Sequence, residues 1–283
     1  MRFKGKIGWP MATQELSEPK TLFRTSLIRV TTALLLAFTI SGPVSSADMT
    51  VREIAELLFK TPQKSRVDLA GLDLNFLDLS GLDFKAAKLA GANLHGSDLT
   101  GANLSHADLS RAVLDRATIV GVDFSGADLS DTLIRLPHAA GSVAFDRANS
   151  PKFFGADLSR ARLVARLDGA DFRNARLAHA NLAPYGDTTQ NTLTRRSVMI
   201  GCDFSGAVLE GADLSEAILR FANFENANLS HANLSGADLT MANLSGADLT
   251  GAIITNANFE GANLGTTKGL GEATGVSRAR NLD

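Results

Sequence analysis

The chain has 283 residues, of which 45% are hydrophobic, 6% aromatic and 20% charged. This length and composition suit one or two folded domains and exclude a disordered or fibrous protein. The 28 Lys and Arg residues and the 30 Asp and Glu residues leave a net charge of −2, so no basic field over the whole protein indicates nucleic-acid binding. The single cysteine, Cys202, excludes an internal disulfide and a cysteine-based zinc or iron–sulfur site.

Residues 1–47 have the organisation of a signal peptide, or export leader. Arg24 and Arg29 precede an uncharged apolar run over residues 30–40, and a site of small residues ends at Ala47. The apolar run is shorter than the roughly 20 residues that a membrane-spanning helix needs. We therefore expect cleavage after Ala47.

Two alternatives stay open at this end of the chain. The leader is either removed or kept as a membrane anchor, and translation begins at Met1 or at Met11. Removal takes away six basic and two acidic residues, which leaves a mature chain with a net charge of −6 and no transmembrane span. We expect an exported protein, periplasmic if the host has two membranes.

A five-residue period runs through most of the mature chain, over residues 67–265. From Val67 the units read VDLAG, LDLNF, LDLSG and LDFKA, and from Ser197 they read SVMIG, CDFSG, AVLEG and ADLSE. The middle residue of each unit, its centre, is large and apolar, and the residue two before it is small in most units. Because a period of five fits neither a helix nor a long strand, the chain must turn once per unit. The centre and the residue two before it then share a face and point inward.

These units resemble the pentapeptide-repeat family, whose consensus is A(D/N)LXX. ADLSG, ANLSG and ADLTG occur here as near-consensus copies. The resemblance implies an all-β fold, a right-handed quadrilateral β-helix with four pentapeptides in each coil. About eight coils at a strand spacing of about 4.8 Å would make a solenoid roughly 40 Å long.

Both ends of the repeat are expected to be capped, because a solenoid exposes apolar surface at its ends. Thr50 and Glu53 form a capping box ahead of an apolar stripe, which predicts a short N-terminal capping helix and linker over residues 48–66. Residues 266–283 leave the pattern and are expected to cover the other end. Bulky residues take the small slot in the first four units, and we expect them to widen the first coil beneath the helix: Val67, Leu72, Leu77 and Leu82.

Asp or Asn precedes most centres, as at Asp203 and Asn223. Ranks of carboxylates could bind metal or imitate DNA phosphates. Both side chains also accept hydrogen bonds from backbone N–H groups at turns, and their interchange between units favours this structural role. Cys202 occupies an inward small slot and is expected to be a buried core residue. The repeat places His95, His106, His179 and His231 on the outside.

No motif for hydrolysis or nucleotide binding occurs in the sequence, and the histidines lack metal-ligand spacing. We therefore expect no enzyme activity, no cofactor and no metal site.

The repeat is interrupted near residues 137–152 and 185–196, and we expect loops there, where recognition often takes place. Between Arg135 and Arg196, ten basic and five acidic residues give a net charge of +5. Arginine suits phosphate and carboxylate groups, so this basic waist is the candidate partner-binding surface; the alternative is that its arginines only solvate the surface. The candidate residues are Arg160, Arg162, Arg173, Arg176, Arg195, Arg196, Phe154 and Tyr185.

These features predict a non-catalytic exported scaffold that mediates protein or anionic-ligand binding in the cell envelope. Its partner would be another envelope protein or an anionic polymer or lipid, and DNA binding is not expected. The family resemblance implies an alternative, a DNA-mimicking protein that binds DNA gyrase and protects it from quinolones. The leader and the basic waist oppose this alternative, because a phosphate mimic needs continuous negative potential.

Overall fold

The computed structural model of the chain describes residues 47–62, 65–139, 149–185 and 196–282. These residues belong to one compact unit, which begins at residue 45. Most of the expected leader and the middle of each interruption of the repeat lie outside the described residues. Within the described ranges, no helix has the length and apolar character needed to cross a membrane.

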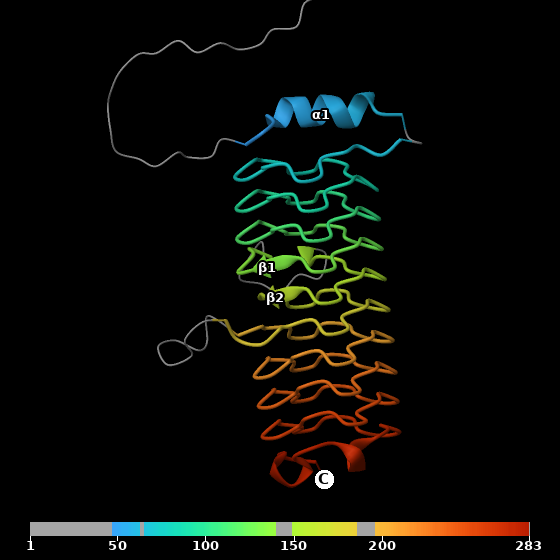
Figure 1. Cartoon of the computed structure of the whole chain (residues 1–283). Helices are drawn as coiled ribbons and strands as arrows, with labels where there is room; N and C mark the ends of the chain where they lie inside the picture. The colour runs from blue at the N-terminus through green and yellow to red at the C-terminus, as the bar shows by residue number, and fades with distance from the viewer. Residues whose placement is uncertain (1–46, 63–64, 140–148, 186–195, 283) are drawn as a thin grey trace, which may run out of the picture. The chain divides into compact units, whose positions relative to one another are not determined.

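Helix α1 (Val51–Lys60) lies across one end of a stack of coils (Figure 1). Thr50 is its N-cap. The Thr50 hydroxyl accepts a hydrogen bond from the Glu53 N–H (3.3 Å), and Glu53 Oε2 accepts one from the Thr50 N–H (2.8 Å). This capping box satisfies two N–H groups at the helix start, where intrahelical acceptors are missing. Ile54 is fully buried and joins the core of the coils.

The bulky residues of the first four units lie in the same core. Val67 is 8% exposed, and Leu72, Leu77 and Leu82 are partly buried against the residues beside them.

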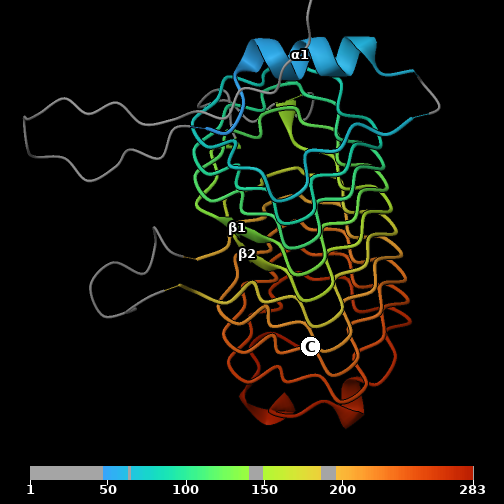
Figure 2. The same cartoon turned by 45° about the horizontal axis from the view of Figure 1, so that its top comes forward.

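Each full coil contains four pentapeptides, because parallel bridges join residues 20 positions apart (Figure 1 and Figure 2). Backbone N–H and C=O groups of one coil thereby pair with those of the next. Four ladders of bridges run along the stack, and we name each by its first residue: the Asp68, Asp73, Asp78 and Asp83 ladders.

Two regular strands occur among the described residues, β1 (Leu133–Arg135) and β2 (Arg162–Val164). They pair in parallel, with Ile134 opposite Leu163. They lie where the repeat shortens, because the next buried centre after Leu163 is Leu167, one residue earlier than the period requires. The backbone stays extended here for three residues instead of turning at once.

Three of the four ladders continue across the first interruption of the repeat, where Asp123, for example, pairs with Lys152, and all four continue across the second, where Arg166 pairs with Val198. The Asp78 ladder has no bridge between the described residues His138 and Arg166. Along the other three ladders, the coils on either side keep the pairing that uninterrupted coils have.

Side chains fill the inside of the coils at the positions that the period predicts; Ala232 and Leu234, for example, are both fully buried. An unexpected feature of this core is a stack of five phenylalanine rings in consecutive coils. Neighbouring centroids are 4.7–5.1 Å apart and the rings are nearly parallel. Contacts between aromatic rings add to the energy of burial, and this stack spans the coils that carry both interruptions. The five rings are those of Phe124, Phe153, Phe172, Phe204 and Phe224.

The last residue of the typical pentapeptide has a left-handed backbone conformation. It is glycine in many units, such as Gly71 (φ 69°), and another residue in others, such as His106 (φ 58°). Glycine adopts this conformation without the steric cost of a Cβ, which explains why so many units end in glycine. From the sequence we expected no more of this position than that it lies outside.

The C-terminal tail extends the ladders although its sequence leaves the five-residue pattern. Lys268, Thr274 and Arg280 pair with residues of the preceding coil, six residues apart instead of five. Two short 3₁₀ helices, η3 (Leu270–Glu272) and η4 (Val276–Arg278), take up the extra length.

Candidate partner-binding surface

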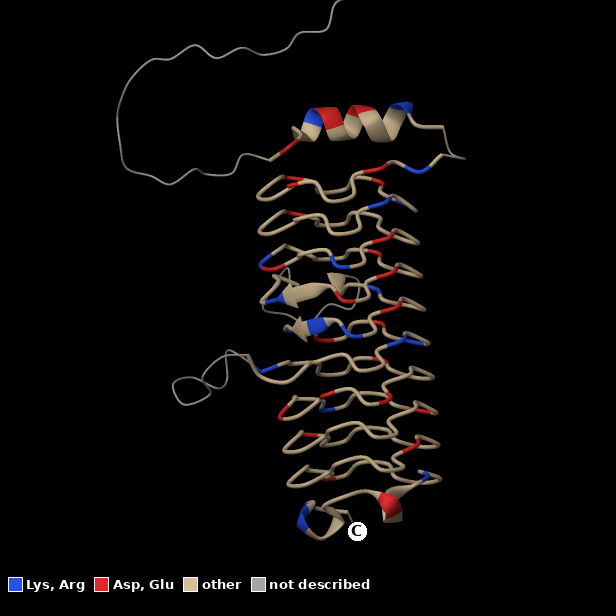
Figure 3. Cartoon of the chain, viewed as in Figure 1, with Lys and Arg blue, Asp and Glu red and all other residues tan. Residues whose placement is uncertain are grey.

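Seven of the eight candidate residues are described by the structure, and Arg195 lies outside it. In Figure 3, Lys and Arg segments occur on the coils that carry β1 and β2 and on their neighbours. The candidate residues do not form one patch, because they belong to units of different ladders. Arg160 and Arg176 belong to units of the Asp68 ladder, Arg162 to a unit of the Asp73 ladder, and Phe154 and Arg173 to units of the Asp83 ladder. Tyr185 directly follows the Asp73-ladder unit that contains Asn181.

Most arginines of the waist are paired with carboxylates. Arg160 donates two hydrogen bonds to Asp131, of 2.8 and 2.6 Å, and Arg173 donates two to Asp171, of 2.9 and 2.7 Å. These bonds raise the pKa of both guanidinium groups and lower the pKa of Asp131. The other ion pairs of the waist are Arg135–Asp115, Arg166–Asp168, Arg176–Asp157 and Arg196–Glu216.

Six of the seven described arginines between residues 135 and 196 therefore form an ion pair. The net charge of +5 counted along the sequence omits Asp115, Asp131 and Glu216, which lie on neighbouring coils. The exposed pairs among them add little stability, but all six neutralise charge that a ligand would otherwise meet. The positive field of the waist is weaker than the linear count implies.

Arg162 is the exception among these arginines. It begins β2, and its Nη1 donates to the carbonyl oxygen (3.0 Å) and the side-chain oxygen of Asn181, while Nη2 donates to the carbonyl oxygen of Pro184 (3.1 Å). Within the described residues, no carboxylate forms an ion pair with it. Burial lowers the pKa of Arg162, because a charge that has lost solvent is less stable. The charge of Asp213 opposes this shift, and the charge of Arg135 adds to it.

Tyr185 lies between two guanidinium groups. Its ring centre is 5.1 Å from the guanidinium carbon of Arg135 and 5.9 Å from that of Arg162. Its hydroxyl accepts a hydrogen bond from Arg135 Nη1 (3.2 Å), and Arg135 Nε is held by Asp115 at 2.9 Å. The ring is 45% exposed, so this cation–π cluster is accessible from solvent.

Arg173 and Phe154 form a second contact, with the guanidinium carbon 5.5 Å from the ring centre. Arg196 pairs with Glu216 at 3.0 Å, and its Nε is buried without a hydrogen-bond partner among the described residues. The structure thus brings together Arg162 with Tyr185 and Arg173 with Phe154, and it separates these two pairs from each other.

The Asp and Asn side chains before the centres confirm the turn role. Asp203 Oδ1 accepts the Ser205 N–H (3.0 Å), and Asn223 Oδ1 accepts the Glu225 N–H (3.2 Å). Asn has a further role that the sequence analysis missed, since Asn223 Nδ2 donates to Asp203 Oδ1 one coil earlier (3.1 Å). The recurrence of Asn 20 residues after Asp is the signal that would have revealed it.

Cys202 is fully buried, and its Sγ donates to the carbonyl oxygen of Leu167 at 2.9 Å, in keeping with a core role. His106, His179 and His231 are exposed. In the part of the chain that the structure describes, no group of three His, Cys, Asp or Glu residues could hold a metal ion.

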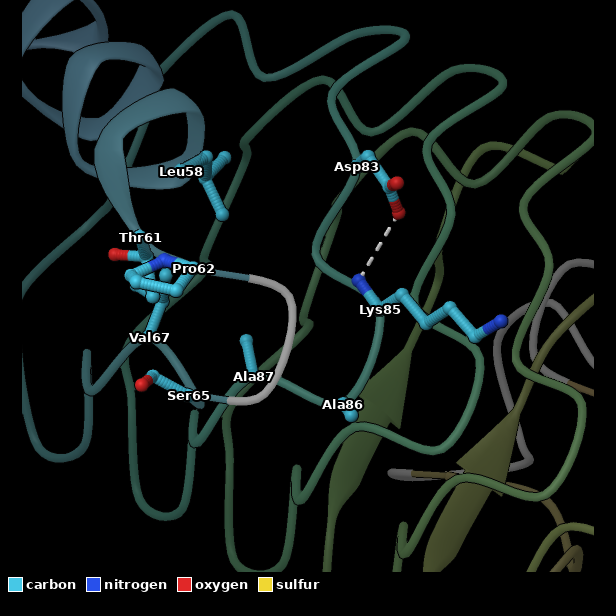
Figure 4. Close-up of a pocket in the computed structure, with 9 residues that line it drawn as sticks. All are labelled: Leu58, Thr61, Pro62, Ser65, Val67, Asp83, Lys85, Ala86 and Ala87. Carbon is cyan, nitrogen blue, oxygen red and sulfur yellow. Dashed lines mark hydrogen bonds between the residues drawn. The ribbon is translucent and has the colours of Figure 1, made fainter.

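A pocket lies between the end of α1 and the first coil (Figure 4). Leu58, Pro62 and Val67 supply apolar lining, and the Asp83 carboxylate accepts the Lys85 N–H (3.2 Å) within its own turn. Figure 4 shows the Lys85 side chain extending away from the other lining residues. The Asp83 carboxylate therefore stabilises its own turn. Among the described residues that line the pocket, no acid and base form a hydrogen-bonded pair of side chains.

A family model of pentapeptide repeats matches the chain in eight copies, over residues 65–101, 92–131, 152–183, 195–230 and 227–265. The chain belongs to the pentapeptide-repeat family. Its fold is the right-handed β-helical solenoid of that family, built from the parallel ladders described above.

Among solved structures, this pentapeptide-repeat chain is similar to HetL, which is involved in heterocyst differentiation regulation in Nostoc sp. strain PCC 7120 (28% identity, 80% of this chain and 94% of HetL covered, TM-score 0.31). It is also similar to QnrB1, a plasmid-mediated fluoroquinolone resistance protein (17% identity, 72% and 89% covered, TM-score 0.34). A pentapeptide repeat protein from the Arabidopsis thaliana thylakoid lumen is a third (26% identity, 44% and 73% covered, TM-score 0.23). A search of curated protein sequences found no match. Family membership therefore rests on the repeat itself.

Proposed function

We propose that this pentapeptide-repeat protein is an exported, non-catalytic scaffold of the cell envelope that binds a protein partner through the outside of its coils. The observation that carries the proposal is the position of the expected cleavage site. Ala47 ends the leader, and Asp48 bonds to the first coil: its N–H donates to the Asp73 carbonyl, and its carboxylate accepts the Asp73 N–H, both at 2.7 Å. Cleavage after Ala47 would remove the leader and keep both contacts.

The proposal takes the solenoid as a four-sided coil closed at one end by α1. Four ladders per coil, with a left-handed residue ending the pentapeptides between them, support the four sides. The burial of Ile54 supports a capping role for α1, because a solenoid end without cover would expose its core.

Recognition on the outside follows from the filled interior. Centres such as Phe172 and Leu234 are fully buried, so a partner meets only the outward positions of the coils and their turns. The waist offers arginines and the half-exposed rings of Phe154 and Tyr185 to such a partner. Arginine and tyrosine are enriched where protein interfaces gain most of their binding energy.

Cell fractionation tests export directly. The full-length chain, produced in its host, should be recovered outside the cytoplasm with Asp48 as its N-terminal residue by Edman sequencing. Leu35→Arg, which places a charge in the apolar run, should leave the protein in the cytoplasm as a control. Wild-type protein found in the cytoplasm with its leader intact would contradict the proposal.

Crosslinking tests the scaffold role. Formaldehyde treatment of intact cells, followed by mass spectrometry, should recover a defined envelope protein with the wild type. Replacing Arg160, Arg162, Arg173 and Arg176 together by Gln should reduce that recovery. Unchanged recovery would show that the waist is not the contact surface. Cytoplasmic protein that inhibits supercoiling by DNA gyrase would instead support the DNA-mimic alternative, which the cations Lys88 and Arg176 on the Asp68 ladder oppose.

A further inference from the structure

Arg162 has hydrogen-bond donors that the described residues do not use. A guanidinium group carries five N–H groups. Nη1 donates to both oxygens of Asn181, and Nη2 donates once, to Pro184. Nε–H and the second N–H of Nη2 have no partner among the described residues. Nε and Nη2 are neighbours on one edge of the guanidinium plane, and such a pair grips the two oxygens of a carboxylate.

The surroundings of Arg162 hold this edge in place. The Asn181 oxygens hold Nη1 and the Pro184 carbonyl holds Nη2, and the Tyr185 ring lies beside the guanidinium. Tyr185 is in turn held by Arg135, whose charge is neutralised by Asp115. Arg162 is therefore the guanidinium of this cluster that forms no ion pair among the described residues. A binding group fixed in advance loses less conformational entropy when a ligand arrives.

Apolar surface borders the same cluster. Leu136 is 46% exposed and Tyr185 is 45% exposed. The Leu136 N–H donates to the Val164 carbonyl at 2.8 Å, which fixes Leu136 against β2. A ligand that places a carboxylate on Arg162 can therefore also cover apolar side chains, as a protein segment does.

The charge of the waist argues against a membrane or polyanion as the ligand. Recognition of an anionic lipid surface takes clusters of several basic residues, about four to eight. Here the neighbouring arginines are paired, and Lys152 lies between Asp123 and Asp171 on the Asp83 ladder. One arginine that forms no ion pair, beside apolar side chains, matches one carboxylate beside an apolar residue.

We propose that Arg162, with the ring of Tyr185 beside it, binds a carboxylate presented by an acidic, partly apolar segment of a partner protein. This inference rests on the proposed scaffold function and names the contact through which the scaffold holds its partner. Arg160, Arg173 and Arg176 then have a structural role, because they form ion pairs with neighbouring aspartates.

The test uses the purified exported form of the chain and a fluorescein-labelled octapeptide of alternating Leu and Glu, with binding read by anisotropy. Arg162→Gln should weaken binding about tenfold, because it removes a charge-assisted pair. Arg160→Gln and Arg173→Gln make the same change in net charge and should stay within about twofold of the wild type. Tyr185→Ala should weaken binding, and Tyr185→Phe, which keeps the ring, should retain most of it.

Circular dichroism and the urea midpoint of each variant establish that the solenoid is intact. Equal losses in Arg162→Gln and Arg173→Gln would show a general field effect and overturn the inference. The absence of peptide binding by the wild type, equal binding of the peptide with Gln in place of Glu, or stronger binding to phosphatidylglycerol vesicles would also overturn it. The assay does not depend on export, so Arg162-dependent binding by a cytoplasmic protein would contradict the scaffold function and leave the site standing.

Discussion

The imidazole of His106 covers the backbone of Gly126 one coil further along, so that a Cβ added to Gly126 would lie 2.6 Å from His106 Nδ1. Both residues end their pentapeptides in the left-handed conformation, with φ of 58° and 65°. The same relation joins His231 to Gly251 and Phe76 to Gly96. In these three pairs, the side chain at the turn position is accommodated by the glycine 20 residues later in the next coil.

This relation predicts different costs for two glycines with the same backbone conformation. Gly121→Ala should destabilise the protein by about 1 kcal/mol, because φ is 65° there and the added Cβ would meet nothing within 4 Å. Gly126→Ala should cost more, since His106 must also move. Urea midpoints measure the cost of each variant. The additional cost of Gly126→Ala over Gly121→Ala should disappear when His106→Ala is combined with Gly126→Ala. Equal costs in the two single variants would mean that the histidine contact is not restrictive.

The inward register predicts a sharp contrast between adjacent residues. Leu234 is fully buried, whereas Ser235 is only partly buried and follows the centre. Leu234→Lys should lower the free energy of unfolding by more than about 3 kcal/mol, because it buries an unpaired charge. Ser235→Lys should change the urea midpoint little. Similar effects at the two positions would show that the register is misassigned.

Before the centres, replacing Asn by Asp should be destabilising, whereas replacing Asp by Asn should not. Asn243 Nδ2 donates to Asn223 Oδ1 (2.9 Å), and Asn243 Oδ1 accepts from Asn263 (3.0 Å). Asn243→Asp loses the donor and should cost about 1 kcal/mol of unfolding free energy in urea titrations. Asp213→Asn keeps the acceptor that Ser215 and Asn233 use, and it should be nearly neutral. Equal costs in Asp213→Asn and Asn243→Asp would show that the side-chain hydrogen bonds between coils do not cause the difference.

The hydroxyl of Ser80 (2.6 Å) and its N–H (3.1 Å) both donate to Asp78 Oδ1 and hold the pKa of Asp78 below its ordinary value. The ionised carboxylate therefore stabilises the folded state: its contribution is complete above the pKa of the unfolded chain and is lost as pH falls through the lower, folded pKa. Ser80→Ala should raise the pKa of Asp78 in a carbon-13 NMR titration. Ser80→Thr keeps a hydroxyl, as Thr250 does beside Asp248, whose pKa is also lowered by the Thr250 side-chain and backbone hydrogen bonds, and it should leave the pKa of Asp78 low. A pKa unchanged in Ser80→Ala would show that the hydroxyl bond is not formed in solution.

The sequence predicts what is local to one pentapeptide. The burial of centres such as Leu69 and Phe259, and the turn role of Asp203, follow from residues within a single unit. Relations between coils were missed because the partners are far apart along the chain. Arg135 and Asp115 are 20 residues apart. A count of charges from Arg135 to Arg196 therefore includes the arginine and omits the aspartate that neutralises it.

The candidate site shows the same limit. The sequence identified Arg162 and Tyr185 as members of a basic, loop-bearing region, but it could not distinguish Arg162 from Arg160. That distinction depends on Asp131 of the preceding coil, whose carboxylate accepts a hydrogen bond from Arg160. Comparing each arginine with the residue one coil away would have paired Arg196 with Glu216 as well.

The phenylalanine stack predicts unequal costs for replacing two buried phenylalanines of the Asp83 ladder. Phe172 lies between Phe153 and Phe204, at 4.7 Å from each ring centre, whereas the next centre after Phe84 on this ladder is Leu104. Both phenylalanines are at most 1% exposed, so Phe→Leu removes similar apolar area at each. Phe172→Leu should cost about 1–3 kcal/mol more of unfolding free energy than Phe84→Leu, because it breaks two stacked pairs worth about 0.5–1.5 kcal/mol each. Matching urea midpoints for the two variants would mean that burial alone, and not ring stacking, holds the interrupted coils in register.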